Sequence, residues 1–118
     1  MKLQAELKFL HSPQLPDLER AHPPDPADFE ILVQALIGAK GQPAADTFDF
    51  IVCTPNRLAK HVASEGTMAG HSYLFVAKYD YAEIRTAILG FCEKAVGQSW
   101  PEIVTILSRY GQWEYEPE

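Results

Sequence analysis

Two aspartates and a histidine are the residues whose types best suit acid–base chemistry in this sequence. Asp46 and Asp49 lie in an expected strand and His71 lies near another, so the three could serve a small hydrolase or nuclease as general acid and base. No electrophilic partner is evident beside them, and carboxylates are common on a solvated strand face. Catalysis by these residues is therefore an alternative, a non-catalytic adaptor domain is another, and we expect the protein not to be an enzyme.

Other catalytic and cofactor motifs are absent from the sequence. None of the four histidines stands at a metal-ligand spacing from another histidine, a cysteine or a carboxylate pair, and no G-x-S-x-G, G-x-G-x-x-G or P-loop pattern occurs. Cys53 and Cys92 both lie among apolar residues without a C-x-x-C motif, which predicts two buried free thiols. We therefore expect no metal and no cofactor.

The distribution of charge is more informative. The chain has a formal net charge of −6 and a pI near 5.1, the wrong sign for binding the backbone of a nucleic acid. Residues 17–30, 41–54 and 110–118 together hold ten acidic residues and one basic residue, whereas the remainder holds six acids and nine bases. If these segments meet in space, they form an acidic surface. The alternative is a solvated polar face that only keeps the protein soluble.

Strand parity indicates which side chains would share that surface. If the inward side chains are those of Leu7, Phe9, Phe48, Phe50, Trp113 and Tyr115, then Glu6, Asp49, Glu114 and Glu116 point the other way. Trp113 could instead be an aromatic anchor on the binding surface, but we expect it in the core. The candidate partner-binding residues are Asp25, Asp28, Glu30, Asp49, Glu114 and Glu116. The direction of Glu30 is open, because its strand is apolar on both faces.

The first half of the chain is expected to form three strands and a long loop. Residues 3–10 alternate with period two, which places Leu3, Ala5, Leu7 and Phe9 inward. Residues 12–28 hold five of the nine prolines and predict a long surface loop, which is either functional or an ordered polar connection. Residues 29–37 and 47–53 flank a Gly- and Pro-containing turn and predict a hairpin.

The second half is expected to be mainly helical. Thr54-Pro55 predicts a short helix that ends near Gly66, and residues 73–78 predict a fourth strand. Asp80 and Ser99 each precede a glutamate by three residues, the pattern of a helix N-terminus. The core side of these two helices is expected to be Ile84, Ile88, Phe91, Trp100, Ile103 and Leu107. Residues 112–116 predict a closing strand.

These elements predict one α+β domain over residues 1–118, because 118 residues with 47% hydrophobic content suit a single core. The expected order is β-β-β-α-β-α-α-β, with a mainly antiparallel sheet of four to five strands and helices on one face. The sequence shows neither a signal h-region nor an apolar run of roughly 18 residues, so we expect a cytoplasmic protein without a membrane span. Its oligomeric state is left open.

The residues also resemble a known family, the immunity protein 8 family of bacterial polymorphic toxin and contact-dependent inhibition systems. The similar segments cover nearly the whole chain: His11-Ser12-Pro13, Asp17-Leu18-Glu19, Pro24-Asp25-Pro26 with Phe29, Phe48-Asp49-Phe50-Ile51-Val52-Cys53-Thr54-Pro55, residues 71–80, Ser99-Trp100 with Glu102, and Arg109-Tyr110-Gly111-Gln112-Trp113-Glu114. The F-D-F-x-V-C-T-P and R-x-G-x-W-E patterns are moderately specific in combination. The resemblance implies a non-catalytic antidote that binds the C-terminal domain of one cognate toxin. Many such toxins are basic nucleases, which would suit an acidic partner.

Overall fold

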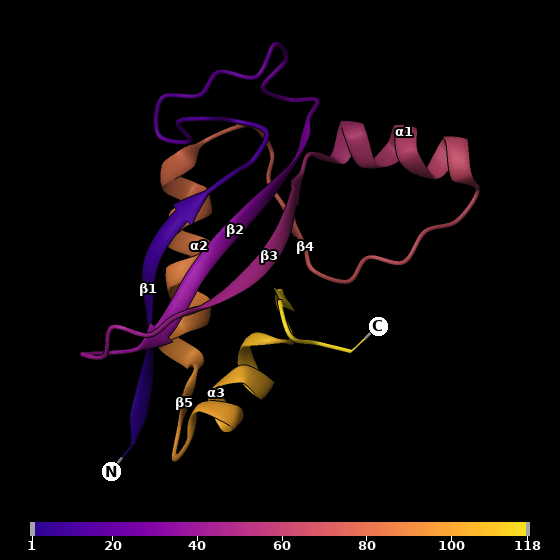
Figure 1. Ribbon diagram of the computed structural model, residues 1–118. Helices are drawn as coiled ribbons and strands as arrows, with labels where there is room; N and C mark the ends of the chain where they lie inside the picture. Colours follow the sequence, from indigo (N-terminus) through magenta and orange to yellow (C-terminus); the bar gives the residue numbers. More distant parts are fainter. Residues whose placement is uncertain (1, 118) are drawn as a thin grey trace.

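The structure, a computed structural model, describes residues 2–117 as a mixed sheet with three helices (Figure 1). The strands are β1 Leu3–His11, β2 Glu30–Ala39, β3 Asp46–Cys53, β4 Tyr73–Phe75, β5 Val96–Gly97 and β6 Gln112–Trp113. The helices are α1 Pro55–Glu65, α2 Tyr81–Lys94 and α3 Trp100–Leu107. This confirms the predicted α+β class and the predicted order of elements, to which the structure adds the two-residue strand β5.

The sheet has the order β4-β3-β2-β1-β5, and β6 also pairs with β3. Every pairing is antiparallel except β3 with β4, which is parallel because the chain leaves β3 through α1 before it returns. β4 pairs with the second half of β3 and β6 with its first half. Residues far apart in the sequence therefore meet along β3.

The helices α2 and α3 cover one face of the sheet, and α1 projects to the side (Figure 1). Between α2, α3 and the sheet lies the core, whose strand side includes Phe48, Phe50 and Val33. From the helices, Ile84, Ile88, Ile103 and Leu107 are fully buried, while Phe91 and Trp100 pack against the core less completely. The predicted helix side of the core is confirmed.

Two of the three predicted helix caps form as expected. The side chains of Asp80 and Ser99 accept hydrogen bonds from the backbone N–H groups of Glu83 and Glu102. The helix α1 begins at Pro55 and ends before Gly66 as predicted, but the hydroxyl of Thr54 does not cap it. That buried hydroxyl instead accepts from the N–H of Phe29 at 3.0 Å and donates to its carbonyl at 3.3 Å. Thr54 thus ties the start of α1 to the start of β2.

The prediction that Phe9 and Tyr115 face inward was wrong. The register of β1 against β2 shifts between Leu7 and Phe9, and such a bulge moves the following side chains to the opposite face. Phe9 is consequently 59% exposed, and Leu10 packs against the core in its place. Tyr115 is 64% exposed because β6 ends at Trp113. Residue 115 is therefore outside the strand, and the alternation of side chains along a strand does not apply to it.

No strand or helix occurs between residues 12 and 29, as expected of a proline-rich loop. The fourth strand is shorter than predicted and ends at Phe75. Cys53 and Cys92 are free and buried, as predicted. In the described residues, no helix combines the length and apolar character that crossing a membrane requires.

Candidate functional site

In the described residues, α2 and α3 leave the other face of the sheet uncovered, and α1 lies only over its end at Glu30. We call this face the open face: the side chains of β1 to β4 that point away from α2 and α3. Cross-strand pairing arranges these side chains in rows. Two rows are apolar, Leu32–Ile51–Tyr73 and Phe9–Leu36, the second completed by Thr47. Between them lies a polar row of His11, Gln34, Asp49 and Gln112.

At the end of the polar row, the surface is hollowed where β4 and β6 meet the edge of β3. The lining of this hollow, called the acidic hollow below, is Asp49, His71, Gln112, Trp113, Glu114, Glu116 and Pro117, and its volume is about 650 Å³. Asp49 comes from β3, Gln112 and Trp113 from β6, and the last three from the segment after β6. The sheet topology therefore brings together three of the predicted binding residues.

Within residues 2–117, the hydrogen-bond donors to the three carboxylates of the acidic hollow are neutral groups. Asp49 accepts from the side-chain amide of Gln34 at 3.1 Å, and Glu114 accepts from the backbone N–H of Thr47 at 2.9 Å. Glu116 accepts from the side chain of Gln112. Among the described residues, no lysine or arginine forms an ion pair with any of the three. Their negative charge is available to a partner.

The other three predicted binding residues lie elsewhere, beside α1. Asp25, Asp28 and Glu30 line a second hollow of about 450 Å³ together with prolines of the long loop and with Arg57 and His61. Asp25 accepts from the backbone N–H of Ala27 at 3.0 Å and so shapes the loop. The six residues therefore divide into two groups that line different hollows.

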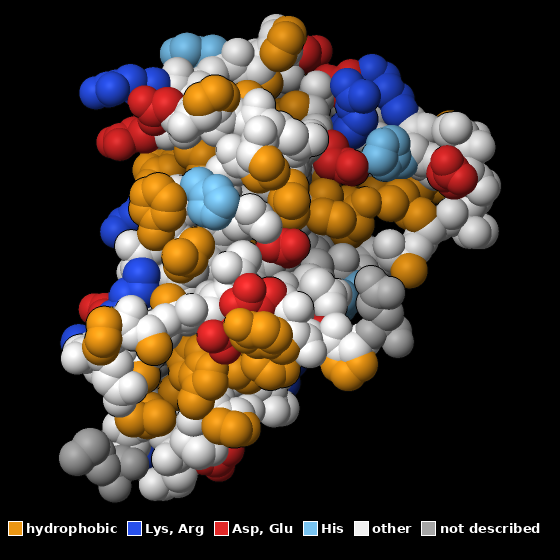
Figure 2. Space-filling view, in the orientation of Figure 1, with side chains coloured by type: hydrophobic (Ala, Val, Ile, Leu, Met, Phe, Trp, Pro, Cys, Tyr) orange, Lys and Arg blue, Asp and Glu red, His pale blue; other side chains and the backbone are white. Residues whose placement is uncertain are grey.

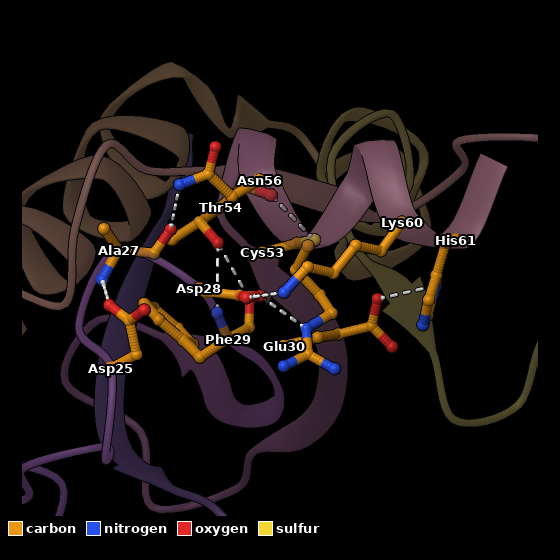
Figure 3. Close-up of polar contacts among 11 residues, drawn as sticks. Asp25, Ala27, Asp28, Phe29, Glu30, Cys53, Thr54, Asn56, Lys60 and His61 are labelled. Atoms are coloured by element: carbon orange, nitrogen blue, oxygen red, sulfur yellow. Dashed lines mark hydrogen bonds and ion pairs between the residues drawn. The ribbon is translucent and has the colours of Figure 1, made fainter. Parts of the chain in front are cut away.

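Asp28 is fully engaged by α1 (Figure 3). Its carboxylate accepts from Nε of Arg57 at 2.8 Å and from Nζ of Lys60, and its side chain is only 12% exposed. The hydrogen bond from Lys60, followed by that from Arg57, holds the pKa of Asp28 below its ordinary value. Asp28 thus positions α1, and little of its charge remains for a partner.

Glu30 also contacts α1, through His61. Its Oε1 lies 3.3 Å from Nδ1 of His61 and is buried without a hydrogen bond (Figure 3). The structure thereby settles the direction that sequence parity left open: Glu30 points to the open face beneath α1.

Comparison with known proteins then decides the family. The family model of immunity protein 8 matches residues 5–117. The chain belongs to the immunity protein 8 family. No curated protein and no solved structure matches it. The match confirms the resemblance inferred from the residues, and this family is one of immunity proteins.

In this immunity protein, Asp46, Asp49 and His71, the residues of the hydrolase or nuclease alternative, do not all lie together. Asp49 and His71 do line the same hollow. Asp46, however, is an odd number of residues from Asp49 and points to the other face, where its Oδ2 accepts from the indoles of Trp100 and Trp113. The three residues therefore do not form one group. Among residues 2–117, no cluster of three or more His, Cys, Asp or Glu side chains could hold a metal ion.

Sequence reasoning missed the apolar rows of this immunity protein's open face. Phe9 and Phe75 are 59% and 50% exposed, and the rings of Tyr73 and Phe75 stack with their centroids 5.4 Å apart. A signal was present in β2, which has Leu32 and Leu36 on the opposite parity to its buried residues. A strand that is apolar on both sides needs cover on both sides, yet α2 and α3 cover only one and α1 reaches only the Glu30 end of the other.

Proposed function

We propose that this protein is the antidote to one cognate bacterial toxin, and that it acts by binding and neutralising the toxin's C-terminal domain without catalysis of its own. Membership of the immunity protein 8 family supports this proposal. The fold supplies a suitable platform, because one face of the sheet is left open and carries both charged and apolar side chains.

The acidic hollow carries the proposal about the chemistry of the toxin. Three carboxylates whose donors in the described residues are all neutral attract a basic surface, speed its diffusional approach and can each pair with a lysine or arginine on arrival. A basic toxin domain, as a nuclease would be, fits this surface. We therefore propose a nuclease-type toxin of a polymorphic toxin or contact-dependent inhibition system, and a cytoplasmic site of action for its antidote.

The six candidate residues would contribute unequally to toxin binding. Asp49, Glu114 and Glu116 form no ion pair with a lysine or arginine of residues 2–117, and they would carry most of the electrostatic attraction. Asp28 is already neutralised by two cations of α1, so its removal would act mainly by displacing that helix. Asp25 and Glu30, at the proline-rich loop and beneath α1, would contribute at the edge of the contact.

The test is a charge reversal of the acidic hollow. Asp49→Lys, Glu114→Lys and Glu116→Lys are combined, and affinity for the toxin encoded beside this gene is measured by calorimetry at low and moderate salt. We expect a large loss of affinity, a slower association rate and a weaker salt dependence. Protection of cells that co-express the toxin should be lost in parallel.

A matched control reverses three exposed glutamates outside the hollow, Glu19, Glu65 and Glu93, and alters net charge by the same amount. Circular dichroism establishes that both variants are folded, and the milder Asp49→Asn, Glu114→Gln and Glu116→Gln variant replaces the reversal if it unfolds. Equal affinity of the hollow variant and the control would contradict the proposal.

The catalytic alternative has one observation in its favour, the shared position of Asp49 and His71 in the acidic hollow. Its test is turnover by the purified protein on nucleic acid and on ester substrates, with Asp49→Asn and His71→Ala as variants. A turnover that both variants abolish would establish an enzyme. The acidic lining opposes this for nucleic acid, because a polyanionic substrate is repelled from it.

A further inference from the structure

The open face combines apolar and polar side chains in an arrangement that constrains what can cover it. Figure 2 shows this side of the molecule: hydrophobic side chains spread across the sheet, with carboxylates among them and the basic side chains of α1 beyond. The apolar rows Leu32–Ile51–Tyr73 and Phe9–Leu36 flank the polar row that contains Asp49. Phe75 extends the apolar surface next to Tyr73.

The apolar rows favour a protein partner. Phe9 and Phe75 are exposed, and Leu32, Leu36, Ile51 and Tyr73 are partly exposed. Apolar side chains on one surface lose contact with water when a partner covers them, and such patches commonly mark interfaces. The rows belong to rigid paired strands, so little conformational entropy is lost on binding.

Asp49 then specifies the charge of that partner. A partner that touches both apolar rows must also cover the polar row between them, which removes water from the carboxylate. In the described structure this carboxylate has a single neutral donor, the amide of Gln34. Burying an ionised carboxylate without a cationic partner is costly, so a matching partner places a lysine or arginine against it.

We infer that the toxin domain docks across the open face, with apolar side chains on the two apolar rows and a basic side chain between them against Asp49. The inference rests on the proposed function and goes beyond it, because it assigns the anchor of the contact to Phe9, Ile51, Tyr73 and Phe75. The acidic hollow continues this surface and receives further basic side chains of the toxin.

A second copy of the chain fits this face less well. Two copies packed face to face would bring their carboxylates together, and each chain has a net charge of −6. Nothing on the polar row supplies a lysine or arginine to offset this charge. Charge complementarity therefore selects a basic partner over self-association.

The experiment uses the full chain and the toxin domain encoded beside it. Phe9→Ser and Phe75→Ser each truncate a side chain that is already half exposed, so both variants should fold. The control is Leu89→Ser, an equivalent change of a partly exposed apolar side chain on α2, on the other side of the sheet. Affinity is measured by calorimetry, and mass in solution is measured by light scattering.

We expect Phe9→Ser and Phe75→Ser each to weaken toxin binding roughly ten-fold or more, as truncation of buried interface aromatics does, and Leu89→Ser to leave it unchanged. Asp49→Asn should weaken binding and reduce its dependence on salt, because it retains the amide contact but not the charge. Tight toxin binding by the wild type with unchanged affinity in both phenylalanine variants would overturn the docking inference alone.

Two other outcomes are distinguishable from that one. If the wild-type chain fails to bind or neutralise the toxin, the proposed function itself fails. If the wild-type chain is a dimer that Phe75→Ser converts to a monomer, the open face is a self-association surface and the inference is overturned.

Discussion

Asp46 accepts hydrogen bonds from the indole N–H groups of Trp100 and Trp113 on the same oxygen, at 2.9 and 3.0 Å. The first indole belongs to the start of α3 and the second to β6. One carboxylate at the start of β3 therefore fastens both the last helix and the last strand to the sheet. Because β6 forms one side of the acidic hollow, Asp46 also positions the proposed binding surface, from the opposite face of the sheet and through Trp113.

Replacing Asp46 with Ala should lower the free energy of unfolding by roughly 1.5–3 kcal/mol, since two half-buried indole N–H groups would lose a charged acceptor. Urea denaturation followed by tryptophan fluorescence measures this loss. Asp49→Ala is the matched control, because Asp49 lies on the same strand with a single amide donor and should cost less. Equal losses of unfolding free energy for the two variants would show that the two indole hydrogen bonds of Asp46 add no stability beyond the single amide bond of Asp49.

Truncating the helix side of the core should cost more. Leu107→Ala and Ile88→Ala each remove most of a fully buried side chain, and such deletions typically cost about 2–5 kcal/mol because a cavity remains. Val62→Ala, on the exposed surface of α1, should cost less than about 0.5 kcal/mol. Chemical denaturation of the three variants checks the order, and losses below about 0.5 kcal/mol at both core positions would contradict this packing.

The helices were the easiest part of the fold to predict, because their signals are local. The caps of α2 and α3 and the apolar spacing of Ile84, Ile88, Ile103 and Leu107 are all contained within single segments of the chain. The bulge that exposes Phe9 is different, because it arises from the pairing of β1 with β2. Strand alternation alone contains no signal for it.

The candidate site was predictable only in part for the same reason. The sequence identifies the acidic segments, and β6 pairing with β3 is what gathers Asp49, Glu114 and Glu116. The capture of Asp28 by Arg57 and Lys60 depends on where α1 lies, which no local pattern fixes. The binding role of all six carboxylates stays a prediction until a toxin is tested.

The two thiols should be inert in the folded protein. Burial, assisted at Cys53 by the negative charge of Glu30, raises the pKa of Cys53 to about 11, and burial raises that of Cys92 to about 11. Thiolate is the reactive form, so both cysteines should resist a disulfide reagent at pH 8 and react fully once urea unfolds the chain. Cys53→Ala and Cys92→Ala report each thiol separately. Rapid labelling of the native protein at either position would contradict its burial.

The ion pairs of Asp28 should make the anchoring of α1 sensitive to acid. Lys60, and then Arg57, lower the pKa of Asp28 in the folded protein below its ordinary value of 3.8. The folded state therefore binds this proton at lower pH than the unfolded state does. The resulting stabilisation is fully present above the unfolded pKa and is lost as the pH falls through the folded one.

Asp28→Asn removes that stabilisation at neutral pH, so the wild type should be more stable than the variant by a constant amount between about pH 5 and pH 7. The difference should shrink below about pH 4, because Asp28 takes up its proton in the unfolded chain at higher pH than in the folded protein. Urea midpoints from pH 7 to pH 3 measure it, and amide hydrogen exchange should show α1 less protected in the variant. The matched control is Asp25→Asn, because the side-chain hydrogen bond of Asp25 in the described residues is from the backbone N–H of Ala27 and not from α1. A difference that persists unchanged to pH 3 would mean that the charge of Asp28 does not hold the helix.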